Sequence, residues 1–222
     1  MRRLPEKASR DVAVLHAVLD AALVAHVAVV DDEGQPFVLP MACARDGDRL
    51  LLHGSTASRL MQSLASGAPT CATITLLDGL VYARSAFESS MHYRSAMVFG
   101  VAVRLPEGEA LEAFRVLTEH LLPGRWAELR LPKRKELAAT TLLALPLTDW
   151  SVKVSDGPPD DPEEDLDSPV WAGVLPLALA VGIPQDAPDL LAGHPVPPHV
   201  GATYPLLGPR PGLPDTVAPT EI

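Results

Sequence analysis

Residues 51–100 read LLHGSTASRLMQSLASGAPTCATITLLDGLVYARSAFESSMHYRSAMVFG, and this stretch decides both the predicted fold and the predicted site. An apolar strand ends in a turn rich in hydroxyl groups, Ser55 to Arg59, and a helix is predicted from Ala57 to Ser66. A second segment of this kind, Ser90 to Ser95, precedes a later strand. Hydroxyls, backbone N–H groups, an arginine and a helix N-terminus together suit a dianionic phosphate. The sequence therefore predicts a phosphorylated cofactor here, with plain helix capping and a solvated arginine as the structural alternative.

The chain before this stretch predicts an antiparallel meander. Apolar residues recur at helical spacing over Asp11–Val24, which indicates an amphipathic helix. Three strands follow, joined by two tight polar turns that each contain a glycine. These strands are expected at Ala25–Val30, Pro36–Arg45 and Arg49–His53.

The rest of the body continues this pattern. In order, the expected elements are a strand at Thr70–Leu77, a hairpin turn at Asp78-Gly79, a strand at Leu80–Ala86, an irregular connection at Phe87–Arg94, a strand at Ser95–Arg104, helices at Glu107–Leu121 and around Lys133–Ala139, and a last strand at Thr140–Val154. At least seven antiparallel strands with few helices indicate a mainly β fold with flanking helices, closed into a barrel.

Charge divides the chain into two parts. The formal net charge is -10, and the stretch from Gly157 onward holds ten acidic residues, one basic residue and fifteen of the 23 prolines. We therefore predict a body, residues 1–156, and an acidic, proline-rich extension, residues 157–222. Residues 157–183 contain Trp171 and an apolar run, so they are expected to pack on the barrel, whereas residues 184–222 are expected to be extended.

Composition argues against several classes of partner. There is no basic stripe that would bind nucleic acid or an anionic membrane surface. The apolar run Val170–Ile183 is too short to span a bilayer, and the N-terminal region has no block of signal-peptide type, so a cytoplasmic location is expected. Cys43 and Cys71 occur singly within predicted strands and away from metal-ligand spacing, so no metal site is predicted.

The order of these elements resembles the FMN-binding split-barrel superfamily of pyridoxamine 5'-phosphate oxidase-like proteins, over roughly Asp11–Val154. The run Met91 to Ser95 and the glycine Gly100 are more similar to the nitroimidazole-resistance reductase-like branch. The resemblance implies an antiparallel FMN-binding split β-barrel. It also implies a homodimer, with each flavin at the subunit interface.

The resemblance carries over only part of the phosphate site. In the family a hydroxyl residue and an Arg-Lys pair commonly hold the FMN phosphate at the helix start. This chain has Ser58 and Arg59 there, followed by Leu60, so Arg94 or Lys153 is expected to replace the second cation.

The predicted cofactor site gathers residues from several predicted strands. Its members are Val38, Leu39, Pro40, Met41, His53, Ser55, Thr56, Ser58, Arg59, Tyr93, Arg94, Ser95, Lys153 and Trp171. The flavin ring is expected along Phe37 to Met41, for which a plain core strand is the alternative, and Trp171 is a candidate to cover it. His53 and His92 are candidates to donate to flavin or substrate, and His92 is the candidate catalytic acid.

These observations predict an FMN-dependent oxidoreductase that acts on a small organic molecule. NADH or NADPH is expected as a transient electron donor, because the chain has no glycine-rich dinucleotide fingerprint. The alternatives are a haem- or F420-binding split-barrel protein and a non-catalytic flavin-binding protein. A vitamin B6 phosphate substrate is not favoured, since the chain ends in acidic residues and proline where a second basic cluster would be needed.

Overall fold

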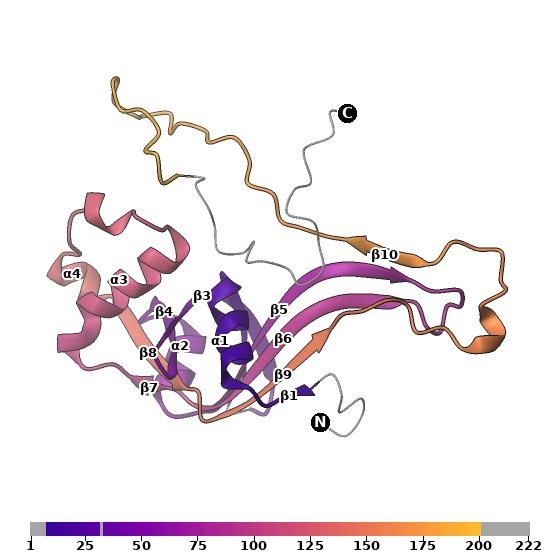
Figure 1. Ribbon diagram of the computed structural model, residues 1–222. Coiled ribbons are helices and arrows are strands. Elements are labelled where there is room, and N and C mark those ends of the chain that lie inside the picture. Colours follow the sequence, from indigo (N-terminus) through magenta and orange to yellow (C-terminus); the bar gives the residue numbers. More distant parts are fainter. Residues whose placement is uncertain (1–7, 32, 201–222) are drawn as a thin grey trace.

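A curled antiparallel sheet forms the centre of the protein in the computed structural model, which describes residues 8–31 and 33–200 (Figure 1). The strands are β1 (Ala8–Ser9), β2 (Val24–Val30), β3 (Pro36–Asp46), β4 (Arg49–Ser55), β5 (Pro69–Tyr82), β6 (Ser90–Val101), β7 (Val103–Arg104), β8 (Thr140–Pro146), β9 (Asp149–Ser155) and β10 (Gly173–Pro176). The helices are α1 (Val12–Ala21), α2 (Arg59–Ala65), α3 (Ala110–Leu121) and α4 (Arg134–Ala138), with 3-10 turns η2 (Glu107–Glu109), η3 (Trp126–Glu128) and η4 (Glu163–Asp165).

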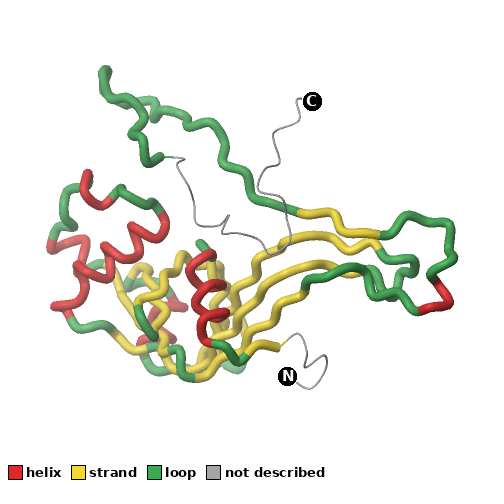
Figure 2. Tube along the Cα trace, in the orientation of Figure 1, coloured by secondary structure: helices red, strands yellow, loops and turns green. Residues whose placement is uncertain are grey.

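The sheet has the predicted antiparallel meander at its centre. In space the strands run β1-β9-β6-β5-β2-β3-β4-β8-β7, and β10 pairs with β5. The tight turns between β2, β3 and β4 place Gly34 at φ 82° and Gly47 at φ 58°, a backbone region that favours glycine. Figure 2 shows α1 against the curled sheet and α3 and α4 to one side of it, so the predicted mainly β split barrel with flanking helices is confirmed.

The inner face of the sheet holds the main core. Leu15, Val18 and Leu19 of α1 pack there against alternate strand residues such as Ile74 and Val98. The buried face of α2, made by Leu60, Met61 and Leu64, joins the same core. Alternation along each strand then places the next residues on the outer face.

Only part of the outer face is covered by a helix in the described structure. Ala113 and Leu117 of α3 pack on Ala44, Leu51 and Leu142. Farther along the same face, from β3 to β6, large apolar side chains stay exposed. They are Val24, Val30, Val38, Leu77 and Met97, with exposed fractions between 37% and 56%.

The predicted hairpin turn at Asp78-Gly79 is wrong. These residues lie inside one 14-residue strand, β5, at a bulge where the pairing with β6 shifts between Leu77 and Gly79. Gly79 does not have the positive φ that a tight hairpin turn would require. A glycine at this position lets the backbone of β10 come close to β5, because a Cβ on residue 79 would lie 3.0 Å from the carbonyl oxygen of Leu175 in β10.

Two other predicted boundaries are corrected in the same region of the sheet. The connection predicted for residues 87–94 is shorter, since β6 already begins at Ser90 and pairs with β5. The strand predicted for Thr140–Val154 is two strands, β8 and β9, separated by Leu147 and Thr148. These two strands lie in different parts of the sheet, β8 against β4 and β9 against β6.

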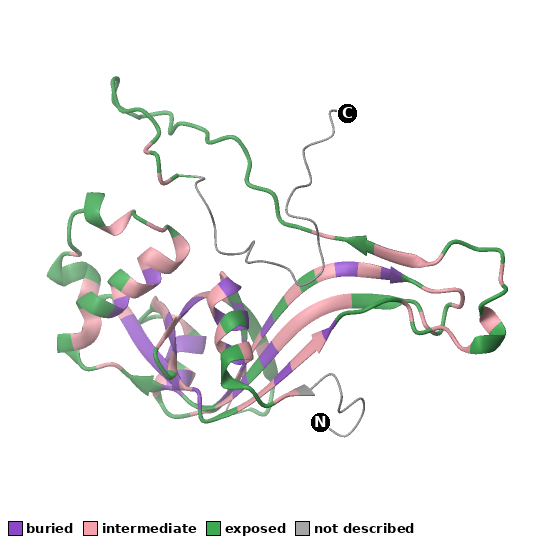
Figure 3. Ribbon diagram, viewed as in Figure 1, coloured by how far each residue is buried: buried purple, intermediate pink, exposed green. Residues whose placement is uncertain are grey.

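Beyond the bulge, β5 and β6 project from the barrel as an arm, which we define as residues 78–94 together with β10 (Figure 1). The extension folds back along this arm, where β10 pairs with β5 from Gly79 to Tyr82. The Asp161 carboxylate, only 1% exposed, accepts hydrogen bonds from the Arg84 backbone N–H at 2.7 Å and from its guanidinium at 2.9 Å. The acidic segment is therefore fixed to the arm, although most of the later extension is exposed (Figure 3).

The predicted division at residue 156 falls just after the end of β9 at Ser155. No described helix has the length and apolar character needed to cross a membrane.

Candidate functional site

The turn that opens α2 keeps the geometry suggested by its sequence. Ser58 is the N-cap, and its Oγ accepts from the Met61 N–H at 3.5 Å, while the Ser55 Oγ accepts from the Ala57 N–H at 3.2 Å. A hydroxyl that accepts from the backbone still has one O–H to donate. Both serines therefore keep a donor, and Ser55 and Thr56 are exposed.

Arg59 lies at the same end of the barrel and is held loosely. Its guanidinium lies 4.5 Å from the centre of the Phe37 ring, and its nearest carboxylate oxygen, on Asp31, is 3.8 Å away. The side chain is 66% exposed. This arginine can therefore exchange a weak ion pair for a charged ligand.

A second group of predicted site residues shares the outer face of the sheet. Ser95 pairs directly with Thr75 on one side and with Lys153 on the other, so their side chains point to the same face. Tyr93 is two residues before Ser95 on that face, and the Lys153 Nζ lies 5.1 Å from the centre of its ring. The structure thus assembles a lysine, a serine, a threonine and a tyrosine from three strands.

Strand β3 divides the predicted ring-contacting run between two faces. Pro40 pairs with His26, which pairs with Thr73, so Pro40 and Val38 share the outer face with Ser95 and Lys153. Leu39 and Met41 pair with the buried residues Val27 and Ala25 on the inner face. Four strand spacings, roughly 19 Å, separate β3 from β9 on the outer face.

His53 lies on the outer face where α3 covers it. Its ring meets the ring of Phe114 edge to face, with centroids 6.4 Å apart. Its Nδ1 is buried and has no hydrogen-bond partner, and burial lowers the pKa of this histidine. The side chain is therefore a neutral imidazole at neutral pH, with a nitrogen that nothing in the described chain satisfies.

Three further predicted residues lie on the arm or next to it. Arg94 donates twice to the Asp78 carboxylate, at 2.8 Å each, and this pair raises the pKa of Arg94. His92 pairs with Gly79 and, by alternation, faces away from Tyr93. Trp171 is 69% exposed and packs on Tyr82, with ring centroids 5.6 Å apart.

The described structure does not bring all the predicted residues to one place. The α2 turn lies apart from the outer-face row, and His92 and Arg94, on either side of Tyr93, face away from that row. The register of β6 with β9 alone unites Ser95 and Lys153, which lie far apart in the chain.

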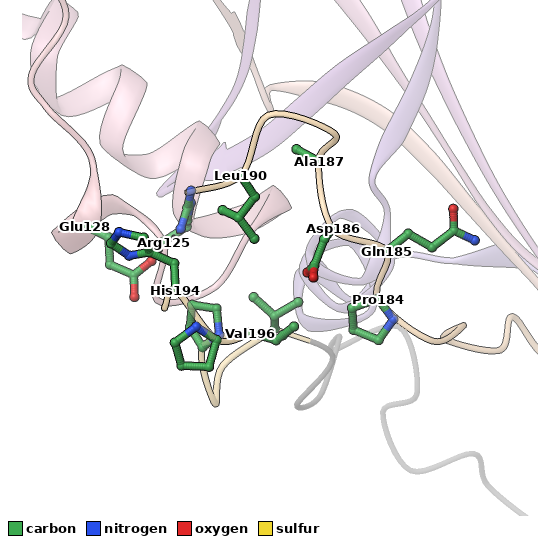
Figure 4. Close-up of a pocket in the computed structure, with 12 residues that line it drawn as sticks. Arg125, Glu128, Pro184, Gln185, Asp186, Ala187, Leu190, His194 and Val196 are labelled. Atoms are coloured by element: carbon green, nitrogen blue, oxygen red, sulfur yellow. Dashed lines mark hydrogen bonds and ion pairs between the residues drawn. The ribbon is translucent and has the colours of Figure 1, made fainter. Parts of the chain in front are cut away.

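A cavity that the sequence analysis did not predict lies where the extension returns to the part of the molecule that carries α3, η3 and α4, the helical end (Figure 4). It measures about 520 Å³ and is lined mainly by residues 184–200, together with Arg125 and Glu128 beside η3. His194 is one of its lining residues, with Leu190 and Val196. The return of a proline-rich tail has no periodic sequence signal, so only the structure could place this cavity.

Fold and site together define a split-barrel protein. The model of the family described as pyridoxamine 5'-phosphate oxidase matches residues 11–154, more than half of the chain. The chain belongs to this family, as its resemblance predicted. No curated protein matches the sequence.

Two solved structures are similar to this chain over nearly the whole length of both proteins. The FAD and heme binding protein from Mycobacterium smegmatis is 46% identical, with a TM-score of 0.84, and the match covers 87% of this chain and 95% of that one. The flavocytochrome Anf3 from Azotobacter vinelandii is 39% identical, with a TM-score of 0.85 and coverage of 90% and 93%. A candidate 5-nitroimidazole antibiotic resistance protein from Bacteroides thetaiotaomicron is 22% identical, with a TM-score of 0.54 and coverage of 66% and 86%, and shows the fold alone.

Proposed function

We propose that this chain is a flavin-binding oxidoreductase whose flavin lies on the outer face of the sheet, beside Tyr93, Ser95 and Lys153. The row Thr75, Ser95 and Lys153 carries this proposal, because two hydroxyls and an ammonium from three strands share one face of the sheet, which no described helix covers there. Lys153 would stabilise negative charge on the cofactor, and its contact with Tyr93 would orient it. The bound flavin would supply the hydride or electron transfer.

The α2 turn fits the phosphate of such a cofactor. Ser55 and Ser58 each keep a hydroxyl donor, and Arg59 is exposed and weakly paired. Replacing Arg59 with Ala should weaken flavin binding by roughly 1.5 to 3 kcal/mol, the value of a charged hydrogen bond. Wild-type affinity in Arg59→Ala would remove the phosphate role from this residue.

FAD is the flavin that we propose, although the sequence predicted FMN. The solved structure that is 46% identical is described as a FAD and heme binding protein, and the match covers nearly all of both chains. The α2 turn and Arg59 could hold a phosphate of either flavin, so the choice depends on the similarity. FMN stays the alternative.

A homodimer is part of this proposal. A flavin on the outer face would have one side against the sheet and the other in water, because the apolar residues around it are exposed in a single chain. A second copy that uses the same face would cover both cofactors by two-fold symmetry. NADH or NADPH is the proposed electron donor and a small organic molecule the substrate; a cytoplasmic location stays a prediction.

Haem is a second proposed cofactor, favoured by His53. Haem iron binds a neutral imidazole nitrogen, and His53 combines a lowered pKa with a buried Nδ1 that has no partner. Two well-covered relatives are described as a FAD and heme binding protein and a flavocytochrome. His53 is the residue that we propose as the iron ligand.

The cofactors are tested on the purified full chain. Released cofactor is separated and its mass measured, and flavin absorbance is followed under nitrogen after NADH or NADPH is added. We expect FAD in about one equivalent per chain and bleaching by one of the two donors. Absence of any flavin after reconstitution with FAD and with FMN would refute the proposal. If flavin is bound but neither NADH nor NADPH bleaches it, the protein binds flavin but is not reduced by these donors, and the oxidoreductase part of the proposal is wrong.

The haem ligand is tested with a pair of histidine variants. After reconstitution with haem, His53→Ala should lose most of the Soret absorbance, whereas His194→Ala should keep it. His194 is the control because it is an exposed histidine in the lining of the cavity near η3, away from His53. A Soret band that is unchanged in His53→Ala would contradict this ligand while leaving the flavin proposal intact.

A further inference from the structure

The extension crosses the molecule as a segment that is fixed at both ends, and we define its residues 178–196 as the strap. At one end β10 pairs with β5, and the Leu177 N–H donates to the Asp78 carbonyl oxygen at 3.0 Å. At the other end the His199 ring lies so close to Gly124 that a Cβ on this glycine would be 3.1 Å from it, and the His199 Nε2 is 3.7 Å from the Glu128 carboxylate. Figure 1 shows the strap running from the arm back to the helical end.

Between these ends the strap packs little against the rest of its own chain. All its residues, from Ala178 to Val196, are exposed. Its large apolar side chains include Leu179, Val181, Ile183 and Leu191, with exposed fractions of 70%, 50%, 92% and 73%. Prolines within the strap limit the entropy lost on ordering, so such a segment can be held against a surface at low cost.

The same chain has a second apolar surface that no described residue covers, the outer face of the sheet around Val38 and Met97. Two exposed apolar surfaces on one chain can cover each other when two copies associate with two-fold symmetry. The apolar outer sheet face of a second copy is therefore a suitable surface for the apolar side chains of the strap.

Charge supports the same partner. Residues 157–200 contain eight acidic residues and no lysine or arginine, and the strap itself contributes Asp186 and Asp189. The body offers the opposite charge at Lys153 on the outer face and at residues 133–135, Lys-Arg-Lys, where α4 begins. An acidic apolar strap on a copy of itself thus combines complementary charge with apolar burial.

We propose that the strap of each chain lies across the outer sheet face of a second copy and closes the flavin site there. This inference rests on the homodimer of the proposed function and adds the surface that forms it. Reciprocal straps make each site depend on both chains.

Photocrosslinking locates the strap in the full chain. A benzoylphenylalanine at position 183 replaces the most exposed strap residue, and ¹⁵N-labelled chains are mixed with unlabelled chains so that interchain peptides can be recognised. We expect a product of twice the chain mass of 23.6 kDa, with crosslinks to β2, β3, β5 or β6 of the other copy. Crosslinks confined to the same chain, or to a different surface of the other copy, would overturn the proposal.

Strap variants measure its contribution. The double variant Val181→Ser/Ile183→Ser should raise the dimer dissociation constant by at least roughly tenfold and lower flavin affinity in parallel. Leu131→Ser is the matched control, since Leu131, between η3 and α4, is 59% exposed and lies outside the strap and the sheet. Light scattering that finds only monomer in the wild type would refute the homodimer itself, whereas an unchanged dimer in the strap variant would overturn only the strap.

Discussion

Lys153 and Arg94 show how the environment separates two cations that look equivalent in the sequence. Both were candidates to replace the missing lysine of the phosphate site. Arg94 is already saturated by two hydrogen bonds to Asp78 on the arm, whereas Lys153 contacts a tyrosine ring and lies beside Ser95. Arg94 is therefore held at the bulge, and Lys153 is the cation that we propose for the cofactor.

This assignment predicts different effects of two substitutions on flavin affinity. Lys153→Ala should weaken binding by roughly 1.5 to 3 kcal/mol, about one to two orders of magnitude in dissociation constant, because a charged hydrogen bond is lost. Arg94→Gln should keep the affinity within about twofold, since this change removes a partner of Asp78 and no cofactor contact. Fluorescence titration of FAD into each variant measures both; the reverse order of effects would place the cofactor on the arm.

The pKa of His53 gives stability a pH dependence in the cofactor-free protein. Burial lowers the pKa of His53 below its ordinary value of 6.5, so below that pH the unfolded chain binds a proton that the folded chain does not. The free energy of unfolding should therefore fall as pH drops from 6.5 toward the lower folded pKa. This part of the loss should be absent in His53→Phe, as urea unfolding at pH 7.5 and pH 5.5 would show. An equal loss in both proteins would contradict it.

Element boundaries show most clearly what the sequence could and could not predict. Alternation and turn residues predicted α1, the β2-β3-β4 meander and α2 because these signals are local. The Asp78-Gly79 pair was wrongly predicted to be a hairpin turn. Its glycine instead allows the close packing of β10, a strand nearly 100 residues later in the chain. The row Thr75, Ser95 and Lys153 depends on how β5, β6 and β9 are aligned with one another. The sequence of one strand alone does not determine this register.

The close approach at Gly79 can be tested directly. Gly79→Ala places a Cβ 3.0 Å from the Leu175 carbonyl oxygen, which should weaken the β5-β10 pairing by roughly 1 to 3 kcal/mol. Hydrogen exchange at Val174 and Leu175 should speed up while the rest of the sheet stays protected. Gly108→Ala, where nothing lies within 4 Å, is the control. Unchanged exchange in Gly79→Ala would show that the strand adjusts without cost.

At the scale of the whole molecule, the two cysteines report on the outer face. Burial raises the pKa of Cys43 to about 12, so its thiol should stay unreactive in the folded protein. Cys71 is only partly buried and pairs with Ala28 on the outer face. A surface covered by a second copy should slow reaction at Cys71 as protein concentration rises.

Thiol labelling at pH 8 measures this protection. We expect at most one reactive thiol per folded chain and two after denaturation, with faster labelling in Val181→Ser/Ile183→Ser than in wild type. A labelling rate that is independent of concentration would argue that the face around Cys71 stays open in the assembly.

The fixed ends of the strap also bear on the affinity of association. Residues 177–199 form a loop closed on the chain itself, so the strap has little conformational freedom left to lose when it meets a second copy. The His199 end, held by one close approach to Gly124 and a contact of 3.7 Å between the His199 Nε2 and the Glu128 carboxylate, is weaker than the four-residue strand pairing at β10. Release of that end would leave a segment that has to be ordered on association, and the dimer would weaken although no contact between the copies had been removed.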